Sequence, residues 1–260
     1  MNVRPIAVSD SIHNIFSACC LSRFNEKAKT IVLPFQYGIN TTDGVSSAIF
    51  ATDVLFRQNE SNVCMSFNFS NAFNSLSRCS IHGALLQYKP ELMPYFQSTC
   101  STNSNLHFGN SILIISSGVK QGDPLGPLLF CLAIHPILLQ IQEMFPFLKM
   151  IAYMDDVVLI GNLNIVKKTT VCFKELFTRI GLRLNSLKCV LLSNSPVSTI
   201  VDGIEIQGKL YSIDAIRLLG SLSGNNDEIT KKLFEKLNSI SDKIDRMMNL
   251  DIKNTSNLPL

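Results

Sequence analysis

The chain has 260 residues and a mass of 28.9 kDa, enough to bury a substantial core, and 46% of its residues are hydrophobic against 17% charged. That balance excludes a disordered chain, and a net charge of +3 is too small to identify a nucleic-acid binder by itself. The charge is uneven, because residues 1–160 hold 9 basic and 10 acidic residues whereas residues 161–260 hold 14 and 10. The second part therefore favours contact with a phosphate backbone, with a solvated basic surface as the alternative.

Cysteine usage and the N-terminal segment indicate a protein of the cytosol or nucleus. The eight cysteines include no Cys-x-x-Cys pair, which argues against a zinc site. Met1–Ala18 mixes charged with polar residues, so no secretory signal is expected. Leu125–Ile141 is nearly all apolar but is interrupted by Pro127 and Pro136. We expect a buried core helix there and no membrane contact.

Apolar periodicity predicts an alternation of helices and short strands. A polar stretch at 193–199 predicts a loop. In chain order the predicted elements are helix Val45–Phe56, strand Val63–Phe69, helix Asn71–Tyr88, strand Ser111–Ser116, helix Leu125–Phe145, strands Met150–Tyr153 and Val157–Gly161, helix Ile165–Ile180 and strand Cys189–Ser193.

The last stretch of the chain predicts one more helix, after the candidate cap Asn226. Its apolar residues recur at steps of three and four, which places them on one stripe. Core packing is the favoured role of this stripe, and a partner-binding coiled coil is the alternative, because the repeat is short. The stripe consists of Ile229, Leu233, Leu237, Ile240, Ile244 and Met247.

Asp155 and Asp156 form the first chemistry-bearing feature. Two apolar β-forming runs within Lys149–Gly161 flank them, a pattern typical of a hairpin with an acidic tip. Adjacent carboxylates are costly unless a cation neutralises them. A solvated turn that uses aspartate for its turn chemistry is the alternative.

The second feature is the glycine-rich string Ser117–Phe130. Gly118, Gly122 and Gly126 allow the backbone to approach a ligand closely, and the amide of Gln121 can donate hydrogen bonds. A glycine-rich loop that caps a core helix explains the glycine and proline residues equally well.

These two strings, in this order, resemble those of a reverse transcriptase of the non-LTR retrotransposon type. The resemblance extends over roughly residues 4–220 and includes further segments in the order of the family. These are Arg4–Ile6 and Gln36–Gly38 of the fingers, Asn68–Arg78 and Gly181–Cys189 of the palm, and Leu218–Gly220 of the primer grip.

The resemblance implies a two-metal nucleotidyl transfer in which two Mg²⁺ ions sit on three palm carboxylates. Asp155 and Asp156 match two of them, and Asn68 stands at the position of the third. An asparagine offers one neutral carbonyl oxygen and cannot bridge two hard cations as a carboxylate does. We therefore expect this copy to polymerise poorly or not at all.

The resemblance also implies a pocket for a deoxynucleoside triphosphate. Phe73 matches the aromatic residue that blocks a ribose 2′-hydroxyl, and Gln121 with Gly122 matches the pocket floor. Arg4 matches an arginine that contacts the nucleotide phosphates, and Lys188 a lysine proposed to assist pyrophosphate departure. Taken alone, Phe73 is more simply explained as a core aromatic residue. For Arg4 and Lys188 a plain surface position and the family's role stay equally open.

Two functions follow from the sequence. The first is an RNA-directed DNA polymerase that acts on an RNA template and a DNA primer, impaired by Asn68. The second is a catalytically inactive nucleic-acid-binding or scaffold protein, and no protein partner is predicted for either. The chain lacks endonuclease and zinc-knuckle sequences and is expected to be a truncated element.

The expected fold is α+β, a polymerase palm whose three- or four-stranded antiparallel sheet is backed by helices. Residues 1–62 are predicted to form a partial fingers region. Residues 63–220 form the palm with an inserted fingers segment, and residues 221–260 form a helical thumb remnant or tail.

Overall fold

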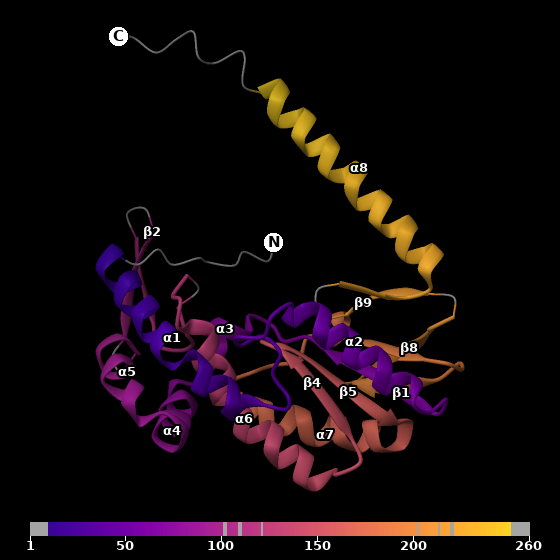
Figure 1. The fold of residues 1–260 in the computed structure, drawn as a ribbon, viewed down its shortest axis with the longest axis horizontal. Coiled ribbons are helices and arrows are strands. Elements are labelled where there is room, and N and C mark those ends of the chain that lie inside the picture. Colours follow the sequence, from indigo (N-terminus) through magenta and orange to yellow (C-terminus); the bar gives the residue numbers. More distant parts are fainter. Residues whose placement is uncertain are drawn as a thin grey trace.

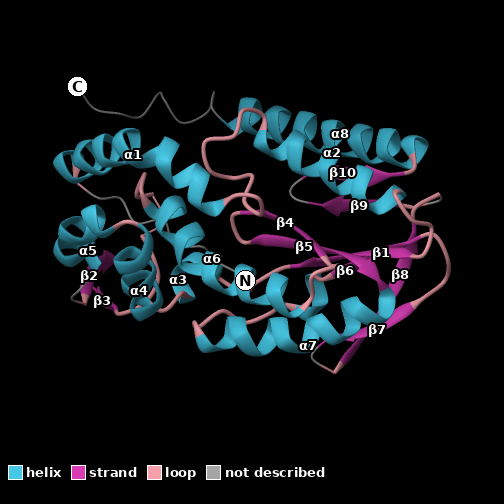
Figure 2. Ribbon diagram, turned by 60° about the horizontal axis from the view of Figure 1, so that its bottom comes forward, coloured by secondary structure: helices cyan, strands magenta, loops and turns pink. Residues whose placement is uncertain are grey.

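The structure is a computed structural model, and it describes residues 10–100, 103–108, 111–120, 122–201, 203–212, 214–218 and 221–250. Helices cover both faces of one sheet, with α2 (Gly44–Arg57) on one side and α7 (Leu163–Arg179) on the other (Figure 1). Figure 2 shows the helices α1 (Ser11–Val32), α4 (Arg78–Tyr88) and α5 (Met93–Cys100) gathered beside this sheet. The predicted α+β class is confirmed.

The sheet has six strands in the order β4–β5–β1–β6–β8–β7. Neighbouring strands are antiparallel except β6 and β8, which run parallel. The prediction of a three- or four-stranded, wholly antiparallel sheet was wrong. It missed β7, which begins within the polar stretch at 193–199 that indicated a loop, and β8, which follows it. The strands are β1 (Asn62–Phe67), β4 (Lys149–Tyr153), β5 (Asp156–Asn162), β6 (Val190–Ser193), β7 (Ser198–Val201) and β8 (Ile204–Leu210).

The side chains of β1 alternate between two apolar clusters. Met65 and Phe67 belong to the larger cluster, which includes residues of α7 and of α6 (Gly126–Met144), whereas Cys64 lies in the cluster under α2. This alternation is the two-residue period of a strand. Because both faces are buried, β1 reads in the sequence as a nearly continuous apolar run.

The predicted helix Asn71–Tyr88 is wrong in one respect, because it is broken. The short helix α3 (Ala72–Ser75) ends before Leu76, and α4 begins at Arg78. The backbone groups between the two helices form hydrogen bonds with distant segments: Ser77 N donates to Ile180 O at 2.7 Å, and Gly118 N donates to Leu76 O at 2.7 Å. These long-range hydrogen bonds replace the helical ones, so apolar periodicity alone could not locate the break.

The remaining elements are short or peripheral. Two separate hairpins pair β2 with β3 and β9 with β10. The single turns η1 and η2 follow α4 and precede β6 respectively. The bounds of these elements are η1 (Pro90–Leu92), β2 (Ser104–Phe108), β3 (Ser111–Ile115), η2 (Ser186–Lys188), β9 (Ala215–Leu218) and β10 (Ser221–Gly224).

The C-terminal helix α8 (Asn226–Leu250) exists as predicted, but its apolar stripe is not part of the core. Asn225 caps it, since its Oδ1 accepts from Asp227 N at 3.0 Å and Glu228 N at 3.1 Å. The helix projects from the β9–β10 hairpin (Figure 1). Leu237 is 59% and Ile244 50% exposed, so the favoured core-packing role was wrong.

Among the described residues, helix α6 is long and apolar enough to span a membrane, yet most of it is buried within the core. Its buried side chains include Leu128, Leu132 and Leu138. This burial confirms the prediction of a core helix for the stretch after residue 125.

His135, also in α6, gives the fold a predicted pH dependence. Burial lowers the pKa of its imidazole below the ordinary value of 6.5, and its Nδ1 has no hydrogen-bond partner among the described residues. As the pH falls below about 6.5 the unfolded chain binds the proton first, so stability is lost on acidification. We expect His135→Met to lose less stability between about pH 6.5 and 5 than the unmodified chain, measured by urea denaturation. An equal loss of unfolding free energy by the two proteins over this pH range would contradict the prediction.

Candidate active site

The acidic turn between β4 and β5 is the centre of the candidate site. Met154 and Asp155 form the two-residue turn between the paired residues Tyr153 and Asp156. Met154 has a φ of 57°, the positive value that a two-residue hairpin turn demands of its first residue. Asp155 and Asp156 are half-buried at the tip. The predicted hairpin is confirmed.

Gln36 clamps this turn. Its amide nitrogen donates to Met154 O at 3.0 Å, and its amide oxygen accepts from Met154 N at 3.0 Å. The flanking backbone runs beside β4, with Tyr37 N donating to Ala152 O at 2.8 Å. Gln36 itself is 0% exposed. The clamp holds Met154, a non-glycine residue, in a left-handed conformation that costs energy. Strained residues of this kind often occur at functional sites.

Removing this clamp is expected to destabilise the turn. Gln36→Met keeps a similar side-chain volume but leaves both backbone groups of Met154 without their partner. We expect the free energy of unfolding to fall by about 2 kcal/mol, measured by urea denaturation. Gln58→Met, at an exposed position, is the control and should change it by less than about 0.5 kcal/mol. Equal stability of the two variants would contradict the clamp.

Asn68 lies beside the acidic turn. In the antiparallel register of β1 and β5, Phe67 pairs with Val157, so the next position sets Asn68 opposite Asp156. Directly opposed Cα atoms lie about 5 Å apart, and their side chains share a face of the sheet. Extending the register in this way brings the two backbones level, and Asn68 is half-buried like the two aspartates. The predicted closeness of their side chains stays a prediction.

Aromatic packing fixes the end of β1 on which Asn68 stands. The ring centroids of Phe67 and Phe173 lie 4.4 Å apart, and those of Phe69 and Phe177 lie 4.9 Å apart. Because Phe67 and Phe69 both face α7, Asn68 between them faces the opposite side, toward α2. Its backbone is also held, since Asn185 N donates to Asn68 O at 2.8 Å.

The glycine-rich loop docks on α3. Val119 N donates to Phe73 O at 2.8 Å, and Ser117 Oγ donates to Asn74 O at 2.9 Å. Gly118 has a φ of 72°, and a Cβ on it would meet Phe73 O at 2.4 Å. Only glycine fits this close approach. Two motifs that the sequence keeps more than 40 residues apart are thus hydrogen-bonded neighbours.

The predicted nucleotide-pocket residues fall in different situations. Phe73 is partly buried and stacks on Phe130, with ring centroids 4.6 Å apart. Gly122 is exposed in the loop with a φ of 111°. Lys188 is exposed in η2, where its N–H donates to Asn185 O at 2.9 Å, next to the Asn68 backbone. Arg4 and Gln121 lie outside the described residues.

Asp123 belongs to a buried network that the sequence did not reveal. Its carboxylate accepts hydrogen bonds from Ser17 and Tyr95 side chains and from Leu125 N at 3.0 Å, and His13 Nε2 lies 3.6 Å away. Burial, together with the hydrogen bond to Asp123, raises the pKa of the Tyr95 phenol. The network ties α1 and α5 to the glycine-rich loop. Asp123 is thereby committed to the fold and does not replace the missing carboxylate at position 68.

The charge of Asp155 reaches the core beneath the turn. Burial first, and the Asp155 carboxylate second, raise the pKa of the Cys131 thiol in α6. Cys131 Sγ also lies 3.9 Å from Met154 Sδ. The acidic turn therefore rests directly on α6, which gives its carboxylates a firm support.

The donor set tests whether the site suits metal ions. Asp155 and Asp156 supply carboxylates, and Asn68 supplies only an amide oxygen. Among the described residues no three His, Cys, Asp or Glu side chains form a cluster for a metal ion. The set suits one hard cation on the paired aspartates, but it lacks the third carboxylate needed to bridge two.

A mixed sheet backed by helices, with an acidic hairpin tip beside the end of the central strand, defines the palm of a nucleic-acid polymerase. Residues 1–222 match the reverse transcriptase (RNA-dependent DNA polymerase) family, and the chain belongs to this family. Members of the family bind an RNA template and generally use divalent metal ions.

Two relatives are Pol polyproteins of R2 retrotransposable elements, in agreement with the predicted non-LTR type. The type-2 element R2DM protein of Drosophila melanogaster is 29% identical over 207 residues, which cover 72% of this chain and 19% of the relative. The type-1 element R2 protein of Popillia japonica is 27% identical over 215 residues, which cover 74% and 30%. The chain therefore spans less than a third of either relative.

Solved structures share the fold. Apo telomerase of Candida tropicalis, truncated from its C-terminal domain, superposes with a TM-score of 0.56 at 13% identity, covering 80% of this chain and 44% of that one. Candida albicans telomerase, in complex with a fragment of telomeric RNA, has a TM-score of 0.52 at 12% identity, covering 82% and 39%. These likenesses confirm the predicted palm architecture.

Proposed function

We propose that this chain is the polymerase portion of a retroelement protein and adds deoxynucleotides to a DNA primer on an RNA template, at a rate strongly lowered by Asn68. The observation that carries the proposal is the register of β1 against β5, which sets position 68 opposite Asp156. The proposal assigns Asp155, Asp156 and Asn68 to one site, in which one of the three side chains is neutral.

In the proposed reaction the primer 3′-oxygen attacks the α-phosphorus of a deoxynucleoside triphosphate. One O–P bond forms, the bond to the leaving pyrophosphate breaks, and the hydroxyl proton passes to solvent. Two Mg²⁺ ions, when bound, supply Lewis-acid activation and offset the charge of the leaving group. Asp155 and Asp156 would hold these ions through their carboxylates. Asn68 weakens that hold, because an amide oxygen carries no net charge.

The remaining residues are assigned to the nucleotide. Phe73, held by its stack on Phe130, excludes a ribose 2′-hydroxyl by steric contact. Lys188 assists the departing pyrophosphate by proton donation or by its positive charge. Its backbone N–H is bonded to Asn185 O, and Asn185 N is bonded to Asn68 O. Gln121, Gly122 and Arg4 bind the base side and the phosphates. These roles follow the resemblance, and the position of η2 supports that of Lys188.

Asn68 favours a second candidate function, a nucleic-acid-binding protein without catalysis. Such a protein keeps the palm and the RNA contacts but no longer transfers nucleotides. Nuclear or cytosolic residence is proposed for either function, and it is supported by all eight cysteines being free thiols.

A primer-extension assay separates the two candidates. The chain as it stands and an Asn68→Asp variant are compared on an RNA template with a DNA primer, deoxynucleotides and Mg²⁺. Extension that is weak in the first and strong in the second supports the impaired polymerase. Silence from both, with RNA binding retained, favours the binding protein, and equally robust extension by both refutes the assigned defect.

A further inference from the structure

The positive charge of this chain is concentrated in one segment. Residues 163–188 hold six Lys and Arg residues and one acidic residue, a net of +5. The rest of the chain holds 17 basic and 19 acidic residues, a net of −2. One tenth of the sequence therefore carries the entire positive excess of the protein.

The fold turns this segment into a continuous exposed surface. One side of α7 is buried through residues such as Phe173 and Phe177, which pack against the end of β1. The other side is exposed and carries Lys167, Lys168, Lys174 and Arg179. We define the basic track as these four residues together with Arg183.

The basic track runs toward the candidate active site. α7 starts after the far end of β5 and returns alongside the sheet, so Arg179 lies at the end nearer the acidic turn. The chain then passes Arg183, whose carbonyl accepts from Ser70 N at 2.9 Å, two residues from Asn68. From Lys167 to Arg179 the track spans about 18 Å, the length of about five nucleotides of a stacked strand.

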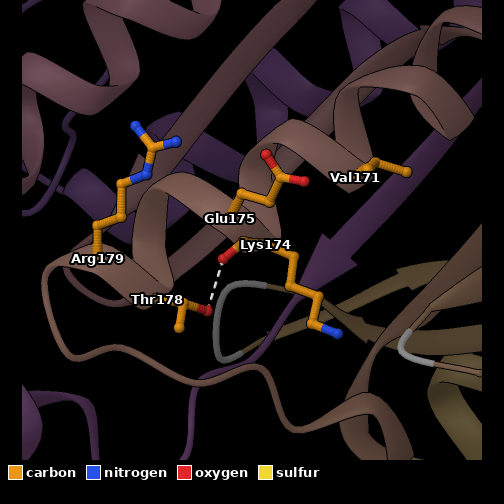
Figure 3. Close-up of a pocket in the computed structure, with 5 residues that line it drawn as sticks. All are labelled: Val171, Lys174, Glu175, Thr178 and Arg179. Carbon is orange, nitrogen blue, oxygen red and sulfur yellow. Dashed lines mark hydrogen bonds between the residues drawn. The ribbon is translucent and has the colours of Figure 1, made fainter.

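A shallow hollow lies on the track. It has a volume of about 430 Å³ and is lined by Val171, Lys174, Glu175, Thr178 and Arg179. Figure 3 shows these side chains along one side of α7, with Lys174 and Arg179 pointing to opposite ends of the group. Val171 is 60% exposed. A concave surface with cations at both ends suits an extended polyanion better than a convex helix does.

The C-terminal helix provides a comparison within the same chain. α8 is also largely exposed, but it carries five basic and five acidic residues. Mixed signs are what a solvated helix face favours, because opposite charges three or four residues apart stabilise each other. α7 has four basic residues and only one acidic residue, Glu175, so its exposed face keeps a net positive charge.

We propose that the basic track binds the phosphate backbone of single-stranded template RNA outside the candidate active site. The inference rests on the proposed use of an RNA template but not on catalytic competence. RNA is the favoured occupant because the track presents cations along about 18 Å, the length of about five nucleotides, and ends on the α7 side of the strand that precedes Asn68. Its recognition is electrostatic and independent of sequence.

The test is the salt dependence of RNA binding. A track variant, Lys167→Gln, Lys168→Gln, Lys174→Gln and Arg179→Gln, is compared with the unmodified chain by anisotropy of a fluorescein-labelled unstructured 30-nucleotide RNA. Four phosphate contacts to a single strand add about 3 to the slope of log K against log salt. Raising salt from about 50 to about 200 mM should therefore weaken the unmodified chain about 50-fold more than the track variant.

The matched control removes four positive charges from α8 in place of α7, by Lys231→Gln, Lys232→Gln, Lys236→Gln and Lys243→Gln. This control should keep the salt slope of the unmodified chain. A control that loses as much affinity as the track variant would overturn the inference, and so would a track variant that binds like the unmodified chain. Tighter binding to phosphatidylserine vesicles than to RNA would also overturn it, in favour of a membrane surface.

Glu175→Gln provides a test in the opposite direction that does not threaten folding, because the residue is exposed. Removing the one negative charge of α7, which lies among the cations of the track, should tighten RNA binding about threefold, and unchanged or weaker binding would contradict the inference. Asn68→Asp should leave the track's salt slope intact. A failure of catalysis therefore appears in primer extension alone, and a failure of the basic track appears in binding alone.

Discussion

An Asn68→Asp variant is expected to extend a DNA primer on an RNA template about a thousandfold faster than the chain as it stands. One unit of charge about 4 Å from a cation is worth about 4 kcal/mol at an effective dielectric of about 20. If that energy acts on the transition state, it corresponds to about three decades of rate. The last pair of the β1–β5 register is Phe67 with Val157, so the next residue, position 68, comes level with Asp156, as this prediction requires. The measurement is the initial rate of extension in excess Mg²⁺ and deoxynucleotides.

Two further variants make this result specific. Asn164→Asp adds the same charge beyond the far end of β5 and should leave the extension rate unchanged. Asp155→Asn, introduced on top of Asn68→Asp, should return the rate to the level of the unmodified chain or below it, since two carboxylates would again remain. An Asn164→Asp variant as fast as Asn68→Asp would show that general charge, and not the site, is responsible.

The parts of this site that lie close together in the sequence were predictable, and the parts that lie far apart were not. The hairpin around Asp155 follows from two apolar runs and a short turn, all within Lys149–Gly161. The closeness of Asn68 and Asp156 was expected from the family resemblance only. The sequence of either strand alone does not determine the register between β1 and β5. The Gln36 clamp joins residues 118 positions apart, and no periodicity points to it.

The fold shows the same division. Helices α2, α6 and α7 were predicted within a few residues, since each has a clear apolar face or an apolar run. Helix α1 was not predicted, because its buried residues are only Ser17, Ala28 and Val32, too few for a visible stripe. The proposed domain boundaries at residues 62 and 220 stay a prediction.

Gly118→Ala is expected to lower the free energy of unfolding by about 3–5 kcal/mol. A left-handed conformation costs an alanine about 1–2 kcal/mol. The new Cβ would stand 2.4 Å from Phe73 O, so the loop must move and weaken the hydrogen bonds of Gly118 N and Val119 N, which adds about 1–1.5 kcal/mol for each. Urea denaturation measures the change.

Gly83→Ala is the control for this substitution, because the chemical change is identical and the surroundings are opposite. Gly83 is exposed within α4, and a Cβ there would meet no atom within 4 Å. A helical alanine in place of glycine should raise the free energy of unfolding by about 1 kcal/mol. The pair thus predicts opposite signs for one change of residue. Destabilisation of similar size at both positions would contradict the close docking of the glycine-rich loop on α3, where Val119 N bonds to Phe73 O.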